Sequence, residues 1–234
     1  MKIHRFIGEF DLQPGYFLLN DPDAAHQIQT VLRLRLGEEL VLGDGRGLEA
    51  PAKIIGFGGG VEIEIAEVRP NGREPQRVVQ LYLGLPKRES LEWVVQKATE
   101  AGVRGVIPLI TARTVKLEGK MDRLQRIAKE AAEQSDRGCL PEIQAAQSWP
   151  AAFALAENND LNILCDPGGE PWREAADKIS QARKVGVFIG PEGGFTAAEI
   201  ALARARKFKI LNLGKLTLRT ETAAIIAVYL TVNG

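Results

Sequence analysis

The stretch Gly190-Pro191-Glu192-Gly193-Gly194-Phe195 indicates the fold of the second half of the chain. It follows the apolar run from Val185 to Ile189 and precedes a helical pattern, which predicts a strand, a loop and a helix. The same order comes next, where the run Ile210 to Leu213 leads through a second loop into an apolar helix from Glu221 to Thr231. Glycine lets the backbone approach a ligand, and N–H groups at a helix start are free to donate. Two such loops on neighbouring strand ends predict one binding pocket.

Strands and helices alternate through the whole region 76–234. Besides the two units above, strands are expected at Val78 to Leu83, Val103 to Ile110, Glu142 to Ala145 and Leu161 to Cys165, and helices at Ser90 to Ala101, Met121 to Ser135, Trp149 to Glu157 and Trp172 to Gln181. Residues Thr196 to Glu199 are a capping-box sequence that starts the helix after the glycine loop. This alternation predicts an α/β domain with a parallel sheet, helices on both faces and ligands at the carboxyl ends of the strands.

The region 1–70 has a different pattern and predicts a small β-barrel or curled sheet. Short β-rich runs are expected at Lys2 to Phe10, Glu39 to Gly43, Leu48 to Phe57 and Val61 to Val68, with one helix from Pro22 to Leu34 that Asp21 caps. The polar segment from Arg69 to Pro75 contains prolines and a glycine, so it is interpreted as a linker. The chain is therefore expected to contain a first domain at 1–70 and a second at 76–234.

Composition excludes several classes of protein. The 30 Lys and Arg balance the 30 Asp and Glu, so a nucleic-acid site would have to be a local basic patch. No apolar run approaches the roughly 18 residues that span a bilayer, and no signal-peptide pattern follows the N-terminus, so a cytoplasmic protein without a membrane partner is expected. Cys139 and Cys165 lack CxxC spacing, and only His4 and His26 are present, so neither a disulfide framework nor a metal site is expected.

The glycine loop does not have the pattern of a nucleotide-phosphate site. Neither the dinucleotide fingerprint nor the P-loop pattern occurs in the chain, and the loop contains a carboxylate, Glu192, where a phosphate cradle would avoid one. The loop therefore favours a ligand that is neutral or cationic, and the sulfonium cofactor S-adenosylmethionine (SAM) fits this description. The alternative is that the loop only turns the chain and that Glu192 is solvated.

The second loop also has two interpretations. Thr220 is expected as the helix N-cap and Glu221 as the first helical residue, so both have a structural explanation. Arg219 is harder to explain as structure, because a cation at a helix N-terminus costs about 0.3–1 kcal/mol. An anionic or electron-rich partner is expected for it. Arg137, at the end of an earlier helix, is either solvated or functional.

Four cations of the first domain are candidates for phosphate contacts. They are Arg5 on a strand and His26, Arg33 and Arg35 on or just after the helix. Arg33 and Arg35 do not share a helix face, so only an irregular helix end would bring both to one ligand. Lys87 and Arg88, before the helix at Ser90, are further candidates for RNA binding.

Taken in order, the motifs resemble the 16S ribosomal RNA uracil-N3-methyltransferase family over essentially the whole chain. The motifs are HRF at 4–6, HxxxxVLRLRxGE at 26–38, QKATEAGV at 96–103, EAAEQSDR at 130–137, IGPEGGF at 189–195 and LGxxxLRTETA at 213–223. The resemblance implies a PUA-like RNA-binding barrel followed by a SPOUT-class methyltransferase domain with a C-terminal trefoil knot. It also implies SAM as cofactor, a homodimer with knot helices packed between subunits, and a substrate uridine in the decoding region of 16S ribosomal RNA within the small ribosomal subunit.

The resemblance also implies roles for individual residues. Arg219 and Arg137, the latter from either subunit, would stabilise the oxygens next to uracil N3, and Glu221 or Glu192 would take the proton or orient the arginines. Cofactor contacts are expected from Cys165, Asp166, Ile189, Gly190, Pro191, Glu192, Gly193, Gly194, Leu213, Gly214, Leu218 and Thr220.

Two departures from the family pattern keep alternatives open. Leu216 stands where the family has arginine, and Asp136 stands where glycine is usual. One alternative is a ribose 2′-O-methyltransferase of the same knotted class, against which the LRTETA ending argues. The other is an RNA-binding assembly factor without catalysis, which only the replacement at Leu216 supports.

Overall fold

The structure is a computed structural model that describes residues 3–85, 88–114 and 121–234, apart from the side chain of Arg88. The chain divides into two compact units. Unit 1 contains residues up to Glu74 together with Ala132–Leu140, and unit 2 contains Pro75–Ala131 and Pro141–Gly234. Among the described residues, no helix is both long and apolar enough to cross a membrane.

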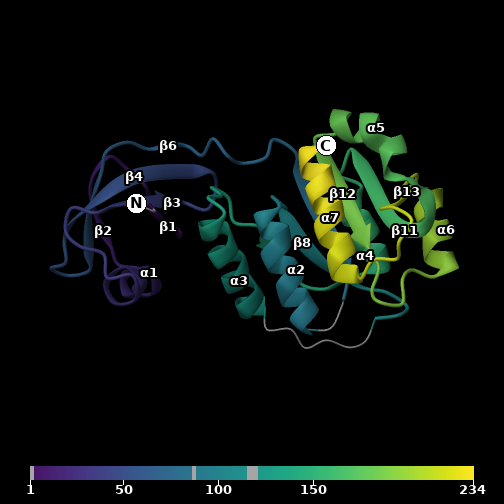
Figure 1. Cartoon of the computed structure of the whole chain (residues 1–234), viewed down its shortest axis with the longest axis horizontal. Helices are drawn as coiled ribbons and strands as arrows, with labels where there is room; N and C mark the ends of the chain where they lie inside the picture. The colour runs from purple at the N-terminus through teal and green to yellow at the C-terminus, as the bar shows by residue number, and fades with distance from the viewer. Residues whose placement is uncertain (1–2, 86–87, 115–120) are drawn as a thin grey trace. The chain divides into compact units, whose positions relative to one another are not determined.

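Unit 1 is built on a six-stranded sheet (Figure 1). The strands are β1 (His4–Ile7), β2 (Gly15–Leu19), β3 (Glu39–Gly43), β4 (Leu48–Gly56), β5 (Val61–Ile65) and β6 (Arg69–Pro70). Their order is β1-β3-β4-β5-β2, with β6 paired to β4; β1 and β3 run parallel and the other pairs antiparallel. Alternate residues of β5, Val61, Ile63 and Ile65, are buried, as the period-two pattern predicts. Strand β2 was not expected from the sequence.

The helical segment of unit 1 ends irregularly. The Asp21 side chain accepts a hydrogen bond of 2.7 Å from Ala24 N and starts α1 (Pro22–His26), as predicted. A π-helical turn, Gln27–Val31, follows. The chain then leaves the helix through Arg33, whose φ of 53° lies in the left-handed region that L-residues rarely adopt.

Residues 69–74 of the expected linker instead belong to unit 1, and only Pro75 belongs to unit 2. Strand β6 pairs with Leu48 and Glu49, and Asn71, only 9% exposed, donates hydrogen bonds to the Glu49 carboxylate (2.8 Å) and the Asp136 carbonyl (3.2 Å). The composition suggested a linker because prolines and a glycine interrupt regular structure. Buried side-chain contacts, which composition does not report, fix this segment.

Residues 132–140 also differ from the expected division, because they cluster with unit 1 and not with the rest of 76–234. Glu74 makes several contacts with them. It accepts hydrogen bonds from Arg137 Nε and Nη2 (3.2 and 3.1 Å) and from the backbone N–H groups of Gly138 (2.8 Å) and Cys139 (3.0 Å). Burial alone would raise the pKa of Glu74, but the Arg137 guanidinium and the two N–H groups lower it below its ordinary value of 4.5.

Unit 2 contains a parallel sheet in the order β10-β8-β7-β12-β11-β13, with β9 beside β8. The strands are β7 (Val78–Gly84), β8 (Gly105–Ile110), β9 (Glu142–Ile143), β10 (Gln147–Ser148), β11 (Leu161–Pro171), β12 (Lys184–Ile189) and β13 (Lys209–Asn212). The helices are α2 (Arg88–Glu100), α3 (Met121–Gln134, of which the residues from Ala132 on belong to unit 1), α4 (Trp149–Ala156), α5 (Ala176–Gln181), α6 (Ala197–Ala205) and α7 (Thr220–Asn233), with a 3-10 turn at Trp172–Ala175. The expected parallel α/β architecture is therefore confirmed.

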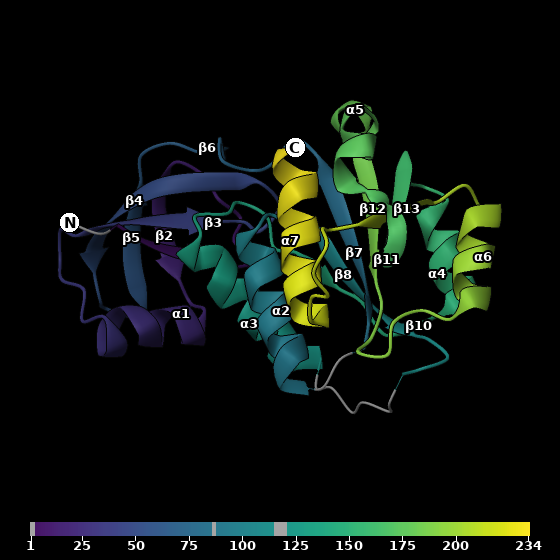
Figure 2. The same ribbon diagram turned by 45° about the vertical axis from the view of Figure 1, so that its right-hand side comes forward.

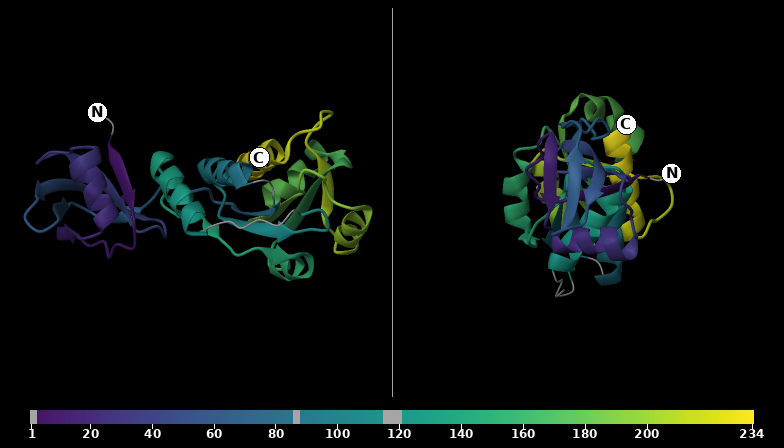
Figure 3. Two further views of the ribbon diagram at one scale, coloured as in Figure 1. Left: turned by 90° about the horizontal axis from the view of Figure 1, so that it is seen from below. Right: turned by 90° about the vertical axis from the view of Figure 1, so that its left-hand side faces the viewer.

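Helices cover both faces of this sheet (Figures 2 and 3). Residues of α2, α5 and α7 form one hydrophobic cluster with Val79, Leu81 and Leu83 of β7. Residues of α4 and α6 form a second cluster with Tyr82, whose ring stacks on Phe188 at 4.1 Å between centroids. Because neighbouring residues of β7 belong to opposite clusters, its side chains alternate between two apolar layers.

Side-chain hydrogen bonds fix the start of α6 and the end of α7. Thr196 and Glu199 form the predicted capping box at the start of α6. Arg77 donates hydrogen bonds to the carbonyls of Thr231 (2.5 Å) and Gly234 (2.8 Å), at the C-terminal end of α7, where a cation is favourable. Helix α7 is not covered on all sides within this chain, because Tyr229 is 59% exposed.

We predict that Glu74→Gln destabilises unit 1 by about 3 kcal/mol at neutral pH, because it removes the carboxylate that pairs with the buried guanidinium of Arg137. The pKa of Glu74 is lowered in the folded state, so its contribution is present above pH 4.5 and is lost as the pH falls below that value. The measurement is hydrogen exchange as a function of pH, which gives the free energy of opening. The informative amides are Leu140 N–H, which donates to the Gly45 carbonyl, and Gly47 N–H, which donates to the Gly138 carbonyl.

The control is Glu67→Gln, which removes an exposed ion pair with Arg69 and should change stability by less than about 1 kcal/mol. If Glu74→Gln and Glu67→Gln lowered the stability equally, the buried contacts of Glu74 would not be what stabilises unit 1.

Candidate functional site

The candidate site lies at the carboxyl edge of the unit 2 sheet, where β12 and β13 end and β11 is interrupted after Cys165. Ile189 pairs with Leu83 on one side and with Cys165 on the other, and Cys165 pairs in turn with Leu211. Because the strands are parallel, the loops that follow these residues emerge together. They are 166–169, the glycine loop 190–195, and 213–219.

The first of these loops is an excursion within β11. Cys165 and Glu170 both pair with Leu211, so residues 166–169 leave the ladder and return to it at the same level. Asp166 accepts a hydrogen bond of 2.8 Å from Gly168 N, and Asn212 Nδ2 donates one of 2.6 Å to the Gly169 carbonyl. An added Cβ on Gly169 would lie 2.7 Å from the backbone of β13, so only glycine permits this approach. The excursion is therefore anchored to the neighbouring strand.

The glycine loop is held against the end of β7. An added Cβ on Gly84 would lie 2.5 Å from the nitrogen and Cδ of Pro191, so the two backbones meet with no side chain between them. Gly194 donates a hydrogen bond of 2.8 Å to the Pro191 carbonyl and has a φ of 69°. Gly190 and Pro191 are buried, whereas Glu192 and Gly193 at the tip are exposed. The loop thus has a fixed base and an accessible tip.

Like Gly194 in the glycine loop, Gly214 in the third loop has a positive φ. Gly214, with a φ of 132°, donates a hydrogen bond of 3.2 Å to the Asn212 side chain. Nothing lies within 4 Å of an added Cβ at Gly214 or at Gly194, so both glycines border open space. Leu216 is 82% exposed, and Lys215 beside it is exposed as well. A ligand between the glycine loop and the third loop would meet bare backbone on both sides.

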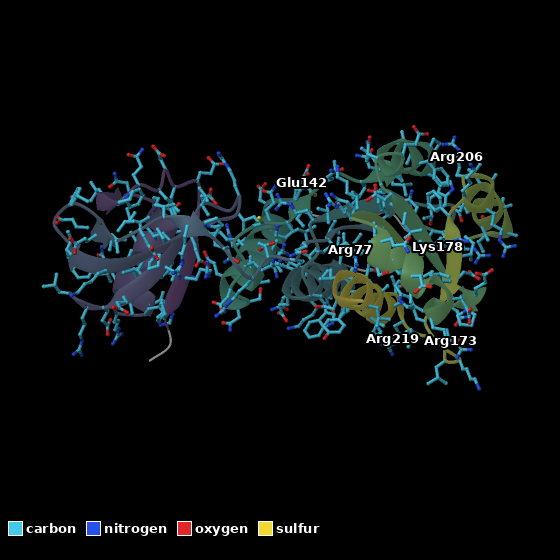
Figure 4. All side chains as sticks on the ribbon, turned by 90° about the horizontal axis from the view of Figure 1, so that it is seen from above. Arg77, Glu142, Arg173, Lys178, Arg206 and Arg219 are labelled. Atoms are coloured by element: carbon cyan, nitrogen blue, oxygen red, sulfur yellow. The ribbon has the colours of Figure 1, made fainter. Side chains whose placement is uncertain are left out.

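Helix α7 starts at the end of the third loop without a side-chain cap. The N-cap residue is Arg219, and Thr220, which the sequence predicted as the cap, is instead the first helical residue and is 6% exposed. The Arg219 side chain, labelled in Figure 4, is 87% exposed and lies 4.0 Å from the Glu221 carboxylate, measured from Nη1 to Oε1. An exposed guanidinium and uncapped N–H groups together form a favourable place for negative charge.

Cys165 is not suited to act as a nucleophile. Burial, with a smaller contribution from the Asp166 carboxylate, raises the pKa of its thiol to about 12. The thiol is therefore uncharged at neutral pH and provides a small apolar surface. Among the described residues, no group of three or more His, Cys, Asp or Glu side chains could hold a metal ion.

The structure assigns Arg137 and Arg5 to the interior of unit 1. Both guanidiniums are almost fully buried: the Arg137 side chain is 6% exposed and pairs with Glu74, and the Arg5 side chain is 8% exposed and pairs with Glu49 at 2.9 Å. The prediction that Arg5 contacts RNA is therefore not supported. A catalytic role for Arg137 would require its pair with Glu74 to open.

The other predicted RNA contacts of unit 1 are exposed. His26, Arg33 and Arg35 are all accessible, while Leu32 and Leu34 pack against the core of unit 1. Arg33 and Arg35 follow the irregular end of the helix, and both are exposed. Lys87 lies outside the described residues, as does the side chain of Arg88.

Sequence reasoning missed one residue at this edge, Arg113. It follows β8 and donates a hydrogen bond to the Gly193 carbonyl at the tip of the glycine loop. Its position could have indicated this role. Arg113 lies three residues after the predicted strand Val103 to Ile110, and in a parallel sheet that strand ends at the same edge as the strand before the glycine loop.

Comparison with protein families defines the class. Residues 73–232 match the model of the RNA methyltransferase domain, and residues 19–65 match that of the RNA methyltransferase PUA domain. The first match covers most of the chain, so the protein is an RNA methyltransferase with an N-terminal PUA domain.

Its relatives identify the family within this class. Ribosomal RNA small subunit methyltransferase E from Synechocystis sp. is 34% identical over 86% of this chain and 68% of its own length. The enzyme of the same name from Bacillus subtilis is 29% identical over 88% of this chain and 85% of its own length. The chain belongs to the ribosomal RNA small subunit methyltransferase E family.

Solved structures agree with this assignment. A Legionella pneumophila protein described as a methyltransferase, in complex with SAM, has a TM-score of 0.87 and 34% identity, with 99% of this chain and 97% of that chain covered. Ribosomal RNA small subunit methyltransferase E from Neisseria gonorrhoeae, bound to SAM, has a TM-score of 0.83 and 28% identity, with 97% and 95% covered.

We predict that Gly84→Ala displaces the glycine loop, because its Cβ would overlap the Pro191 backbone. Overpacking of this kind costs about 1–3 kcal/mol. The expected result is a lower free energy of unfolding and faster hydrogen exchange over residues 190–196. Gly59→Ala is a matched control, because an added Cβ there meets nothing within 4 Å. An unchanged exchange rate in Gly84→Ala would show that the close approach does not hold the loop.

Proposed function

We propose that this protein transfers a methyl group from SAM to N3 of a uridine in the decoding region of 16S ribosomal RNA. The observation that carries the proposal is the meeting of three glycine-containing loops at one sheet edge, next to Arg219 at the uncapped start of α7. The family of the chain supports ribosomal RNA as the substrate. Unit 2 is the catalytic domain in this proposal and unit 1 the RNA-binding domain, both in the cytoplasm.

The residues of the carboxyl edge fit SAM. Gly194 and Gly214 border open space, so their backbones can contact a flat ligand directly. The uncharged thiol of Cys165 would contact an apolar part of it, and the Legionella and Neisseria structures hold SAM in the same fold. The contacts proposed come from the three loops and from the residues that flank them: Cys165, Asp166, Ile189, Gly190, Pro191, Glu192, Gly193, Gly194, Leu213, Gly214, Leu218 and Thr220. SAM supplies a methyl group made electrophilic by its sulfonium sulfur.

The chemistry assigned to the chain is stabilisation of the uracil anion. The N3–methyl bond forms while the sulfur–methyl bond breaks, and the N3 proton must leave. Negative charge develops on the oxygens beside N3 as this proton leaves, and it is neutralised as the N3–methyl bond forms. Arg219 and the N–H groups of α7 would stabilise this charge. The Glu221 carboxylate lies 4.0 Å from the Arg219 guanidinium, which supports the proposal that Glu221 orients this guanidinium or takes the proton. Glu192, at the exposed loop tip, is the other acceptor.

The trefoil knot and the homodimer are further parts of the proposal. Strand β13 lies at the edge of the sheet, yet α7, which follows it, packs on β7 and β12 beyond β11, so the chain must cross back over the strands that precede it. A knot is one way to make this crossing. The accessible Tyr229 and Leu230 of α7 give a second subunit an apolar surface to cover.

Transfer of labelled methyl from SAM to small ribosomal subunits from a strain without this enzyme tests the function. The modified nucleoside is then identified. N3-methyluridine is expected. A 2′-O-methylated ribose would replace the proposal with a ribose methyltransferase, and RNA binding with no methyl transfer would favour an assembly factor.

We predict that Arg219→Ala lowers kcat about 100-fold or more with little change in the dissociation constant of SAM, since its charge acts on the developing anion. Glu221→Gln should lower kcat and flatten its dependence on pH, whereas Glu192→Gln should do neither if Glu221 takes the proton. Arg206→Ala, which removes an exposed arginine paired with Glu157, is the control. Full activity of Arg219→Ala in a folded protein would exclude the assignment.

We predict that Arg33→Gln and Arg35→Gln weaken RNA binding and lower its salt dependence. Each lost phosphate contact should reduce the slope of log K against log salt by about 0.7–0.9. SAM binding should not change. Lys53→Gln, an exposed cation on β4, is the control for general charge. Equal slopes for the control and the arginine variants would contradict a specific contact.

A further inference from the structure

The turn after β8 has a fixed shape. Thr111 N donates to the Thr114 hydroxyl at 2.7 Å, that hydroxyl donates to the Leu109 carbonyl at 3.3 Å, and Thr114 N donates to the Thr111 carbonyl at 3.2 Å. These bonds close the segment 111–114 on itself. The direction of Arg113, between the two threonines, is therefore set by its own turn.

Arg113 holds one peptide of the glycine loop from the outside. Its Nη1 donates to the Gly193 carbonyl, while the N–H of the same peptide, from Gly194, donates to the Pro191 carbonyl at 2.8 Å. The C=O and N–H of a trans peptide point in opposite directions, so the two bonds fix the peptide plane from both sides. A Cβ on Gly193 would lie 3.0 Å from Arg113 Cδ, so glycine leaves room for the side chain.

A second tie joins the same turn to the far end of the loop. Glu199, 8% exposed, accepts a hydrogen bond from Ala112 N at 3.0 Å through Oε1. Through Oε2 it accepts bonds from the Thr196 N–H (2.7 Å) and hydroxyl (2.9 Å). The loop is thus tied to the turn after β8 at its tip and at its end.

We propose that Arg113 is a positioning residue that holds the glycine loop in the conformation that binds the cofactor. The inference rests on the proposed function, because it takes this loop as the SAM site. Arg113 acts through the Gly193 carbonyl and does not touch the reacting groups. A loop that is ordered before binding loses less conformational freedom when the ligand arrives. A charge-assisted bond suits this purpose, because it is about twice as strong as a neutral one.

The test compares Arg113→Ala and Arg113→Lys with the wild type in three measurements: the dissociation constant of SAM by calorimetry, hydrogen exchange of residues 190–196 in ligand-free protein, and kcat at saturating SAM. Arg113→Ala should raise the dissociation constant about tenfold and speed exchange in the loop, with kcat and Tm nearly unchanged. Arg113→Lys, which keeps the charge, should fall between the two. Arg126→Ala, an exposed arginine of α3, should match the wild type.

The outcomes separate this inference from the function on which it rests. A wild type that binds no SAM contradicts the proposed function, and loop exchange in ligand-free protein then still decides whether Arg113 orders the loop. Unchanged exchange and an unchanged dissociation constant in Arg113→Ala overturn the inference. A large loss of kcat at saturating SAM also overturns it, because it assigns Arg113 to the reacting groups. If Arg113→Ala does not fold, the same three measurements on Arg113→Lys decide whether Arg113 orders the loop.

Discussion

The site depends on the direct approach of two backbone segments, at Gly84 and Pro191. An added Cβ on Gly84 would lie 2.5 Å from the Pro191 nitrogen, so the glycine loop starts on the surface of the sheet itself. Backbone contact is less adjustable than side-chain packing, because no rotamer can change to relieve it. The pairing of Ile189 with Cys165, and of Cys165 with Leu211, then sets the height of the other two loops. A rigid sheet thus positions three irregular segments, the usual way in which a scaffold presents functional loops.

Unit 1 depends on a polar cluster that joins residues far apart in sequence. Arg5 pairs with Glu49 at 2.9 Å, Glu49 accepts a hydrogen bond from Asn71 at 2.8 Å, and Arg73 pairs with Asp136. Asp136, at a position where the family resemblance predicts glycine, has a φ of 59°, in the region that glycine favours. Its carboxylate also lies 3.7 Å from Arg5 Nε. The substitution therefore places backbone strain beside a side chain that makes two ionic contacts.

The sequence predicted the features that depend on local pattern. The alternation of apolar runs located the strands and helices of unit 2, and the glycine motifs located two of the three loops. It did not predict β2, because Gly15-Tyr16-Phe17-Leu18-Leu19 shows no alternation of polar and apolar residues. It did not predict the ordered structure of 69–74 either, because long-range contacts to Glu49 and Asp136 fix this segment. Long-range contacts also explain why the sequence suggested an RNA contact for Arg5, which pairs with Glu49. They explain as well why it gave no role to Arg113, which bonds to Gly193. Whether an arginine is buried or exposed, and which carbonyl it meets, depends on segments distant in sequence.

The excursion in β11 separates the length of a loop from the register of the sheet. Cys165 and Glu170 both face Leu211, so the residues between them add nothing to the ladder on either side. Pro167 and Gly168 lie at the exposed middle of the excursion. Insertions or deletions of residues there cost little loop entropy and move no other strand. The glycine loop has no such freedom, because contacts at its base, tip and end fix its length. Evolutionary change in the shape of this pocket is therefore expected to occur mainly through the excursion, while the glycine loop keeps its length.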